Sequence, residues 1–278
     1  MDLHTNLNLN LNLPHLARTL GALLHQNRTL LATSAAALAV GLPVLARVRA
    51  DYRAWHALGE NGLPLNPFGY AFQALASPFA RRDQRAPAPY DLAALAASPR
   101  YGAITLRSFL RLPNGGELPA RAGPRPEVPA FVGPHRQTSQ ASGAAVRAQQ
   151  SAFLSALARA NPALLQLKPS NLEGPRYDGL YVHGSMPRRP EFRFLNGEFA
   201  HAHGEGSTHV VLSLADAEAA IARGWAERHR MSGVGRLMPW SFVLVYGPRD
   251  EAELALWKEF VLASARYALG EEGEVAVP

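Results

Sequence analysis

Residues 198–212 read EFAHAHGEGSTHVVL, and this stretch predicts two β-strands joined by a glycine-flanked turn. Side chains alternate faces along a strand, so His201 and His203 point to the same side. A three-residue turn, Gly204-Glu205-Gly206, pairs His201 with His209 and places glycine where such hairpins need a left-handed residue. All three imidazoles then share one face, opposite a row of apolar side chains. A four-residue turn would instead send His209 into that apolar layer, so we favour the odd turn.

The apolar periodicity on either side of this hairpin predicts further strands and helices. Strands are expected at residues 164–168, 179–183, 191–195, 198–203, 208–213 and 240–246. Helices are expected at residues 144–160, 214–223 and 251–269. Because strands and helices mix without regular βαβ alternation, the sequence predicts an α+β fold in which helices cover an antiparallel sheet.

An apolar segment near the N-terminus precedes this unit. Residues 30–46 read LLATSAAALAVGLPVLA, seventeen uncharged residues between Arg28 and Arg47, which is the lower limit for a membrane-spanning helix. We therefore expect an N-terminal transmembrane or membrane-anchor helix, with a signal peptide, a transit peptide and a buried core helix as alternatives. Nearby arginines are more frequent after the segment than before it, so the positive-inside rule places the C-terminal bulk in the cytosol. The expected location is that of a single-pass endomembrane protein.

These features divide the chain into three expected parts. Residues 1–58 form a disordered head and the anchor helix, residues 59–143 a helical patch and a Pro/Gly-rich linker, and residues 144–278 the compact domain. The helical patch reads PLNPFGYAFQALASPFARRD at residues 64–83, and it either lies in a membrane interface or packs on the domain. Residues 112–143 are rich in proline and glycine, which is typical of a linker or of a long ordered wrap around the domain.

Composition and charge exclude several classes of protein. The chain has 278 residues, a formal charge of +6 and no cysteine, so disulfide scaffolds, thiolate metal sites and cysteine nucleophiles are excluded. The basic excess lies in residues 1–136, where fourteen arginines stand against seven acidic residues beside the apolar segment. This placement favours membrane lipids as a partner, whereas nucleic acid is not expected because no basic helix or zinc knuckle appears. No GxSxG, P-loop or GxGxxG motif supports a serine hydrolase, a nucleoside triphosphatase or a dinucleotide-binding enzyme.

Three segments in the C-terminal half carry a family resemblance. They are GEFAHAHGEGSTHVVLSL, ARGWAERHRMSG and PWSFVLVYGPRDEAEL, and they follow one another at short spacings. Together they resemble the luciferase-domain family, which contains the fungal luciferase of glowing mushrooms, over residues 196–269. Upstream, an apolar helix followed by ARVRADYRAWHALG resembles the membrane helix of that family and the segment after it.

The resemblance implies an oxygenase. In the luminous members a membrane-bound enzyme adds O2 to 3-hydroxyhispidin, a catechol-bearing pyrone, and the peroxide formed loses CO2 to leave caffeylpyruvate in an excited state. The resemblance also implies that no cofactor beyond O2 is required. The mushroom luciferases have a hairpin turn two residues longer with an additional histidine, whereas this chain offers only GEGS. We therefore expect a luciferase-like oxygenase acting on an enolisable phenolic pyrone, with or without light.

The positions that match the family supply the candidate site residues. The candidate catalytic residues are His201, His203, His209, His229 and Arg228, and the candidate substrate-binding residues are Trp225, Trp240, Tyr246, Arg249 and Glu198. Oxygenation without a cofactor needs a base that converts an enol into an electron-rich enolate, and histidine is the natural base near neutral pH. A cation such as Arg228 would hold the developing oxygen anion, and the tryptophans would stack on the aromatic substrate. Glu198 has the parity of the apolar layer, so a strand-edge or supporting role is its alternative.

Two other functions stay open on the sequence alone. His201, His203 and His209 have the spacing of a three-histidine site for a divalent metal with open positions for water or O2, which would make the chain a metalloenzyme. Alternatively, the chain is a non-enzymatic, membrane-tethered module that binds a small aromatic molecule or a protein in the same cleft. The expected partners of the oxygenase are a small aromatic substrate and membrane lipids.

Overall fold

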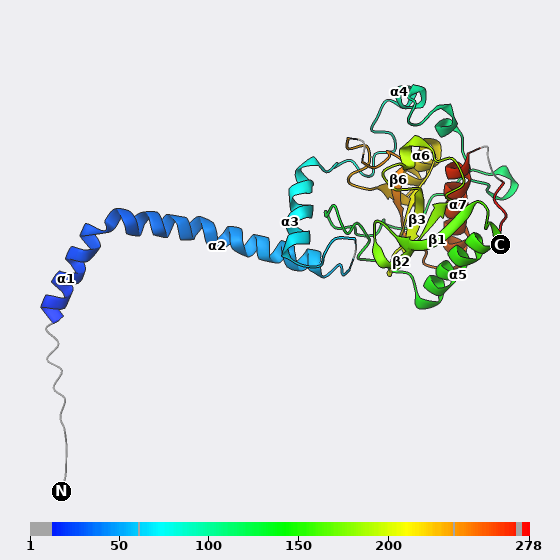
Figure 1. The fold of residues 1–278 in the computed structure, drawn as a ribbon. Coiled ribbons are helices and arrows are strands. Elements are labelled where there is room, and N and C mark those ends of the chain that lie inside the picture. Colours follow the sequence, from blue (N-terminus) through cyan, green and yellow to red (C-terminus); the bar gives the residue numbers. More distant parts are fainter. Residues whose placement is uncertain (1–12, 61, 236, 271–273) are drawn as a thin grey trace, which may run out of the picture. The chain divides into compact units, whose positions relative to one another are not determined.

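The chain forms two compact units, Met1–Ala54 (unit 1) and Trp55–Pro278 (unit 2). The computed structural model describes residues 13–60, 62–235, 237–270 and 274–278 (Figure 1). The first twelve residues of the expected disordered head therefore lie outside the described residues. All of the proposed chemistry falls in unit 2.

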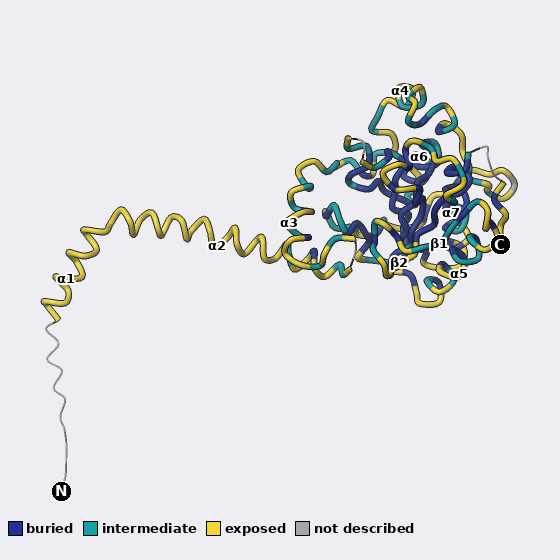
Figure 2. Tube along the Cα trace, viewed as in Figure 1, coloured by how far each residue is buried: buried dark blue, intermediate teal, exposed yellow. Residues whose placement is uncertain are grey.

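Unit 1 holds helix α1 (Leu13–Gln26) and most of helix α2 (Arg28–His56). Residues 13–50 are exposed along their whole length (Figure 2). Helix α2 is long and apolar enough to cross a membrane, and none of its apolar window is buried. A signal sequence near an N-terminus has the same properties, so the helix fits the expected anchor by length and composition alone.

Unit 2 is built on one six-stranded antiparallel sheet, which confirms the α+β expectation. Its strands run in the order β1-β2-β3-β4-β6-β5. Their bounds are Leu165–Ser170 for β1, Gly174–Val182 for β2, Glu198–Ala202 for β3, Thr208–Val211 for β4, Ala226–Arg228 for β5 and Phe242–Val245 for β6. The three-residue strand β5 was not expected from the sequence.

The strand expected at residues 191–195 is wrong. Pro190–Phe192 forms a short 3-10 helix, η4, and turns follow it up to β3. Asn196 and Gly197 both have positive φ angles, of 52° and 85°, which an extended strand does not allow. Of the apolar residues that suggested a strand, Phe192 and Leu195 are buried, whereas Phe194 is exposed.

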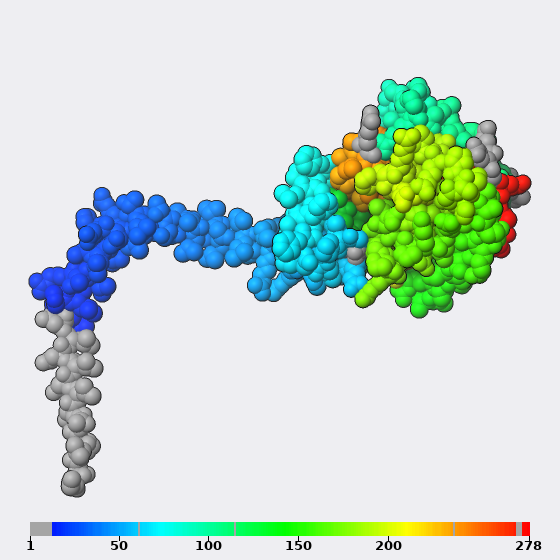
Figure 3. Space-filling view, in the orientation of Figure 1, coloured from blue at the N-terminus to red at the C-terminus, as the bar shows by residue number. Residues whose placement is uncertain are grey.

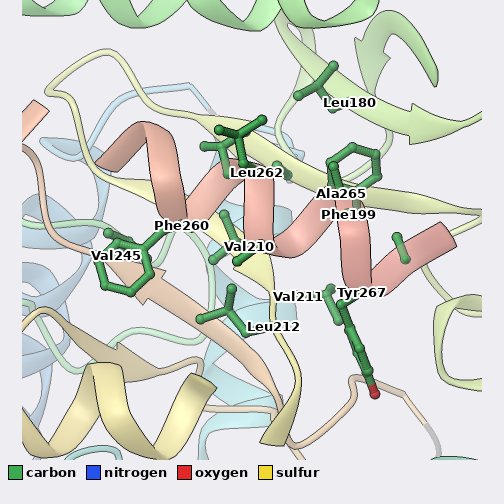
Figure 4. Packing of buried hydrophobic residues seen from close by; sticks show 14 of the residues in the cluster. Leu180, Phe199, Val210, Val211, Leu212, Val245, Phe260, Leu262, Ala265 and Tyr267 are labelled. Carbon is green, nitrogen blue, oxygen red and sulfur yellow. The ribbon is translucent and has the colours of Figure 1, made fainter. Parts of the chain in front are cut away.

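Three helices pack against the sheet or its edges. They are α5 (Ala144–Ala160), α6 (Leu214–Ala222) and α7 (Glu251–Leu269), and all three agree with the expected ranges to within one residue. Ser213 and Asp250 cap α6 and α7 by accepting hydrogen bonds from the backbone N–H three residues on. Helix α7 contacts strands β2, β3 and β4, and Figure 4 shows its apolar side chains among those of the strands. Helix α7 therefore covers one face of the sheet with apolar side chains.

The part of unit 2 before α5 wraps around the sheet. It contains α3 (Pro67–Ala76), η1 (Ser77–Phe79), α4 (Leu92–Ala97), η2 (Ala103–Leu106) and η3 (Pro113–Gly115). The Pro/Gly-rich stretch 112–143 is an ordered wrap and not a free linker. Its backbone and side chains bind the sheet region: Trp225 Nε1 donates to Pro119 O at 2.6 Å, and Gly247 N donates to Gln137 Oε1 at 2.8 Å.

The hairpin between β3 and β4 has the expected odd turn. His201 pairs directly with His209, and Ala202 pairs with Thr208. Gly206 occupies the third turn position with φ of 105°, and its N–H donates to His203 O at 3.0 Å. His201 and His209 consequently point to the face of the sheet opposite the apolar core.

Candidate active site

Five histidine side chains meet on this face of the sheet. They are His135, His201, His203, His209 and His229, and each residue is at most 5% exposed. The closest ring centroids, those of His203 and His209, lie 4.8 Å apart, and those of His135 and His209 lie 5.4 Å apart. Four of these histidines were candidates from the sequence. His135 was not, because the wrap brings it to the sheet from a stretch without periodicity.

Three of the imidazoles form a line between two buried carboxylates. Glu198 Oε1 lies 2.7 Å from His201 Nδ1, and His201 Nε2 lies 3.1 Å from His209 Nδ1. His209 Nε2 then lies 3.1 Å from His135 Nδ1, and His135 Nε2 lies 3.6 Å from Glu227 Oε1. We call this set the imidazole line. When all three rings are neutral, they supply three N–H protons to its four gaps, and the line has room for one additional proton.

A β-bulge turns Glu198 onto the histidine face. Leu180 pairs with Ala200, but the next residue of β2, Tyr181, pairs with Glu198, so Phe199 is an extra residue in β3. The parity expected from the sequence, which placed Glu198 with the apolar layer, is therefore wrong. The supporting role that was its alternative fits the contact with His201.

Hydrogen bonds keep Glu198 ionised although it is buried. Its carboxylate accepts hydrogen bonds from Ser170 Oγ at 2.6 Å, from Tyr181 OH at 2.8 Å and from Asn171 N at 2.9 Å. Burial alone would raise the pKa of Glu198, but the bonds from His201, Ser170 and Tyr181 outweigh it and lower the pKa. A negative charge therefore faces His201 Nδ1, which fixes the proton of that ring on Nδ1.

His203 is not part of the imidazole line and is a cation at neutral pH. Burial disfavours its charged form, but Glu173 and Glu205 outweigh burial and raise the pKa of His203 to about 9. Its Nε2 lies 3.4 Å from Glu173 Oε1, and the pKa of Glu173 is lowered to about 2 despite its burial. Arg136 binds the other oxygen of Glu173. At neutral pH these groups form a buried ion pair.

His135, His209 and His229 are neutral at neutral pH. Burial and the neighbouring imidazoles hold the pKa of His209 and of His229 well below the ordinary value. Burial also lowers the pKa of His135, although Glu227 opposes the shift. One cationic and several neutral imidazoles thus lie within a few ångströms of each other, so the cluster holds both a charged ring and proton acceptors.

An apolar cavity of about 480 Å³ opens onto the cluster. His135, His201, His209 and His229 line one part of it. Apolar side chains line most of the rest, namely Leu63, Phe72, Val132, Leu172, Phe194, Met231, Leu237, Met238 and Phe242. Phe242 also stacks on His209, with ring centroids 4.8 Å apart. The cavity is large enough for a drug-sized aromatic molecule and presents the imidazole line to it.

Seven of the ten expected site residues do not line this cavity. Two of them, His203 and Glu198, contact histidines of the cluster, and the other five lie elsewhere. These five are Trp225, Arg228, Trp240, Tyr246 and Arg249. Arg228 is buried among backbone carbonyls, donating to Trp240 O at 2.9 Å and to Pro87 O at 2.6 Å. Arg249 pairs with Glu253, and Tyr246 reaches the cluster only through Glu227, to which it donates at 2.9 Å. Their assignment to a catalytic or substrate-binding role stays a prediction that this cavity does not support.

Four acidic or basic groups of the cluster were missed by the sequence reasoning. They are His135, Glu173, Glu205 and Glu227. A usable pattern existed for Glu227, because Glu227 and His229 stand two apart and share a face if the chain is extended there. Glu173 and His135 come from loops, and no local pattern places them.

The cluster also contains donor sets that fit a metal ion. Glu173, His201, His203 and His209 form one set, and His135, His209 and His229 form a second, each with ligand atoms within 4.8 Å of one another. Imidazole and carboxylate donors suit zinc, iron or copper. Glu198 and Glu227 face the second ring nitrogens of His201 and His135, as carboxylates often do behind metal-bound histidines.

Comparison with known proteins finds a family model that matches this region. The Luciferase domain model matches residues 196–264, the segment that holds four of the five clustered histidines. This match confirms the resemblance to the luciferase-domain family seen in the sequence and supports a luciferase-type function in general.

Fungal luciferases are similar to this chain over most of its length. The chain is 28% identical to the luciferase of Armillaria ostoyae over 85% of this chain and 88% of that protein. It is 26% identical to the luciferase of Armillaria mellea, over 87% and 89% respectively, and 26% identical to that of Neonothopanus nambi, over 83% and 84%. No solved structure gives a significant match.

Proposed function

We propose that the chain is a luciferase-type oxygenase that adds O2 to an enolisable phenolic pyrone, 3-hydroxyhispidin or an analogue, with loss of CO2. The observation that carries this proposal is the imidazole line, which borders an apolar cavity and holds one proton fewer than its four gaps accept. The matches to fungal luciferases support the reaction class. Light emission is not part of the proposal.

The imidazole line acts as the base. Both of its ends are carboxylates, which attract ring N–H groups, so the gap without a proton falls between two rings, where ring nitrogens present lone pairs. An acidic enol hydroxyl in the cavity transfers its proton to that gap, and His201 is the ring closest to the Glu198 charge that stabilises the cation formed. The enolate left behind gives an electron to O2, and the two radicals combine to a peroxide that loses CO2.

The cavity supplies the other requirements of this chemistry. Its apolar walls exclude water from the enolate and the peroxide. No arginine or lysine stands among the described residues that line it, so the developing oxygen anion is left to the imidazole N–H groups. This differs from the role given to Arg228 and Arg249 by the sequence.

Oxygen consumption tests the proposal. We expect the full chain, treated with a chelator and supplied with 3-hydroxyhispidin, to consume O2 above the spontaneous rate in a cell that also counts photons. The photon count distinguishes a luciferase from an oxygenase that works in the dark. A folded chain that binds the pyrone without consuming O2 would contradict the proposal and indicate a non-enzymatic binding module.

A divalent metal site is the second candidate, because the cluster contains two sets of donor atoms close enough to hold an ion. Both sets contain His209, whose Nδ1 faces His201 and whose Nε2 faces His135. Ligand nitrogens about 2.1 Å from one ion stand about 3.0–3.4 Å apart, and the 3.1 Å between His201 Nε2 and His209 Nδ1 falls in this range. The metalloenzyme predicts stoichiometric metal after purification without added ions, measured by elemental analysis. His209→Ala would then lose the metal from both sets, whereas a chain purified without metal excludes this candidate.

We also propose that α2 anchors the protein as a single-pass helix in an endomembrane, with unit 2 in the cytosol. The support is the apolar window of α2 together with the arginines that follow it, Arg47, Arg49 and Arg53. Failure of the full chain to float with lipid vesicles would contradict the anchor.

A further inference from the structure

The exposed apolar side chains of unit 2 are concentrated in one place. Eight large apolar side chains of its described residues are exposed: Phe68, Phe72, Leu75, Phe79, Leu106, Phe194, Leu237 and Val277. Four of these lie on α3 and η1, and two more, Phe194 and Leu237, line the cavity described above. Six of the eight therefore belong to one helix or to the mouth of one cavity, which is not the scatter expected of a water-facing surface.

Helix α3 exposes its large apolar side chains and buries a polar one, which is the reverse of an ordinary surface helix. Its buried residues are Gly69 and Gln73, whereas Phe68 is 84% exposed and Leu75 is 75% exposed. A helix on a water-facing surface buries its apolar side and exposes its polar side. The helix is nevertheless well formed, because Asn66 accepts hydrogen bonds from Phe68 N and Gly69 N and Pro67 begins the first turn. Its outward face is thus built for an apolar environment.

The exposed apolar side chains also ring the entrance to the cavity. Phe72 of α3, Phe194 of the turn before β3 and Leu237 of the loop before β6 are each exposed and each line the cavity. They come from three segments far apart in the sequence. Figure 3 shows α3, in cyan, on the outer surface of unit 2. Whatever covers α3 therefore also covers the way into the cavity.

We propose that this apolar mouth, formed by Phe68, Phe72, Leu75, Phe79, Phe194 and Leu237, docks on a lipid bilayer, so that the cavity takes its aromatic substrate from the membrane interface. Two observations favour a bilayer over a second copy or another protein. Only residues 47–54 separate the apolar segment of α2 from unit 2 in the chain, so a membrane crossed by that segment holds unit 2 at its surface. Exposed arginines, Arg82 and Arg193, follow Phe79 and precede Phe194, and arginine attracts anionic headgroups.

The docking does not depend on the reaction. Only the loading of substrate from the membrane rests on the proposed oxygenase function, so the two parts need separate measurements. The absence of cysteine from the chain makes the first measurement direct, because a single introduced cysteine carries a single label.

Fluorescence quenching in vesicles tests the docking. Phe68→Cys, Leu75→Cys and Leu237→Cys are prepared in the full chain, labelled with an environment-sensitive fluorophore and reconstituted in vesicles that contain lipids with a nitroxide on the upper acyl chain. We expect these labels to lose most of their fluorescence. Leu106→Cys and Val277→Cys are the matched controls, because both residues are exposed but neither belongs to the apolar mouth, and their labels are expected to keep their fluorescence.

Several results would overturn the docking. The first is equal quenching at the test and control positions, and the second is no quenching at Phe68 and Leu75. The third is a broadened electron paramagnetic resonance spectrum of a nitroxide attached at Leu75→Cys, which would show that two copies meet there. A chain that does not stay with the vesicles also overturns it.

Kinetics test the loading from the membrane. Phe68→Ser combined with Leu75→Ser changes two residues that do not line the cavity. We expect a higher KM for a pyrone dissolved in vesicles, with kcat unchanged, and no change for the same pyrone supplied in water without vesicles. If the unmodified chain and the double variant have the same KM for the pyrone in vesicles, loading from the membrane is contradicted, even where the quenching result stands.

Discussion

Replacing His201 with glutamine is expected to lower the rate constant for enzymatic oxygen uptake by about 100- to 10,000-fold, the range that a general base contributes. Glutamine fills a similar volume and offers an acceptor, but it cannot take up a proton. The substitution therefore interrupts the imidazole line between Glu198 and His209. Oxygen consumption under saturating substrate, corrected for the spontaneous rate, is the measurement.

Two further variants separate the chemical role of His201 from a structural one. His183→Gln is the matched control, because His183 is a strand-end histidine outside the cluster that contacts Ser185 Oγ at 2.7 Å, and its substitution should leave the rate unchanged. Glu198→Gln removes the charge that stabilises the protonated ring, so the pH–rate profile should move to lower pH with a smaller loss of rate. Full activity of a folded His201→Gln variant would rule out the imidazole line as the base.

The local part of this structure could be predicted from the sequence. The helices at 144–160, 214–222 and 251–269 have clear apolar periodicity, and two of them have side-chain caps, Ser213 and Asp250. The parity of the hairpin followed from one glycine, Gly206, whose positive φ closes a three-residue turn. Because parity decides which face each side chain occupies, this single inference placed His201 and His209 on one face correctly.

The parts that the sequence did not predict depend on contacts between distant residues. Strand β5 has only three residues and exists because it pairs with β6, so it has no pattern of its own. The bulge at Phe199 is visible only when β2 is aligned with β3. His135 and Glu173 reach the cluster from loops whose course is set by tertiary hydrogen bonds, among them Trp55 Nε1 to Gly133 O at 2.7 Å.

Arg228 shows how far tertiary contacts can differ from what a local pattern suggests. An arginine next to His229 suggests a cation for the active site, but residues of one strand alternate faces, and Arg228 points away from His229. Its guanidinium instead donates to the carbonyl of Pro87 and to the hydroxyl of Tyr90, the latter at 3.0 Å. Arg228 therefore fastens the segment that holds Pro87 and Tyr90 to the sheet, and its catalytic role stays a prediction.

The buried histidines should make the stability of the metal-free protein depend on pH in both directions. The folded-state pKa of His203, about 9, lies above the unfolded value of about 6.5. Its contribution to the free energy of unfolding is therefore fully present below pH 6.5 and is lost as the pH rises through 9. The pKa values of His135, His209 and His229 are lowered, so the unfolded chain binds more protons than the folded one below pH 6.5, and stability falls there.

Stability should consequently be highest near pH 6.5. It should decline by a few kcal/mol as the pH falls below that value and as it rises from there to about 9, at about 1.4 kcal/mol for each unit of pKa difference. Urea unfolding at pH 5.5, 7.5 and 9.5, with a chelator present, measures the effect. His203→Gln removes the group that titrates near pH 9, so its free energy of unfolding should change less between pH 7.5 and 9.5 than that of the unmodified chain, while the acid-side decline stays. An alkaline decline of the same size in both proteins would show that His203, paired with Glu173, does not lose its proton in this pH range.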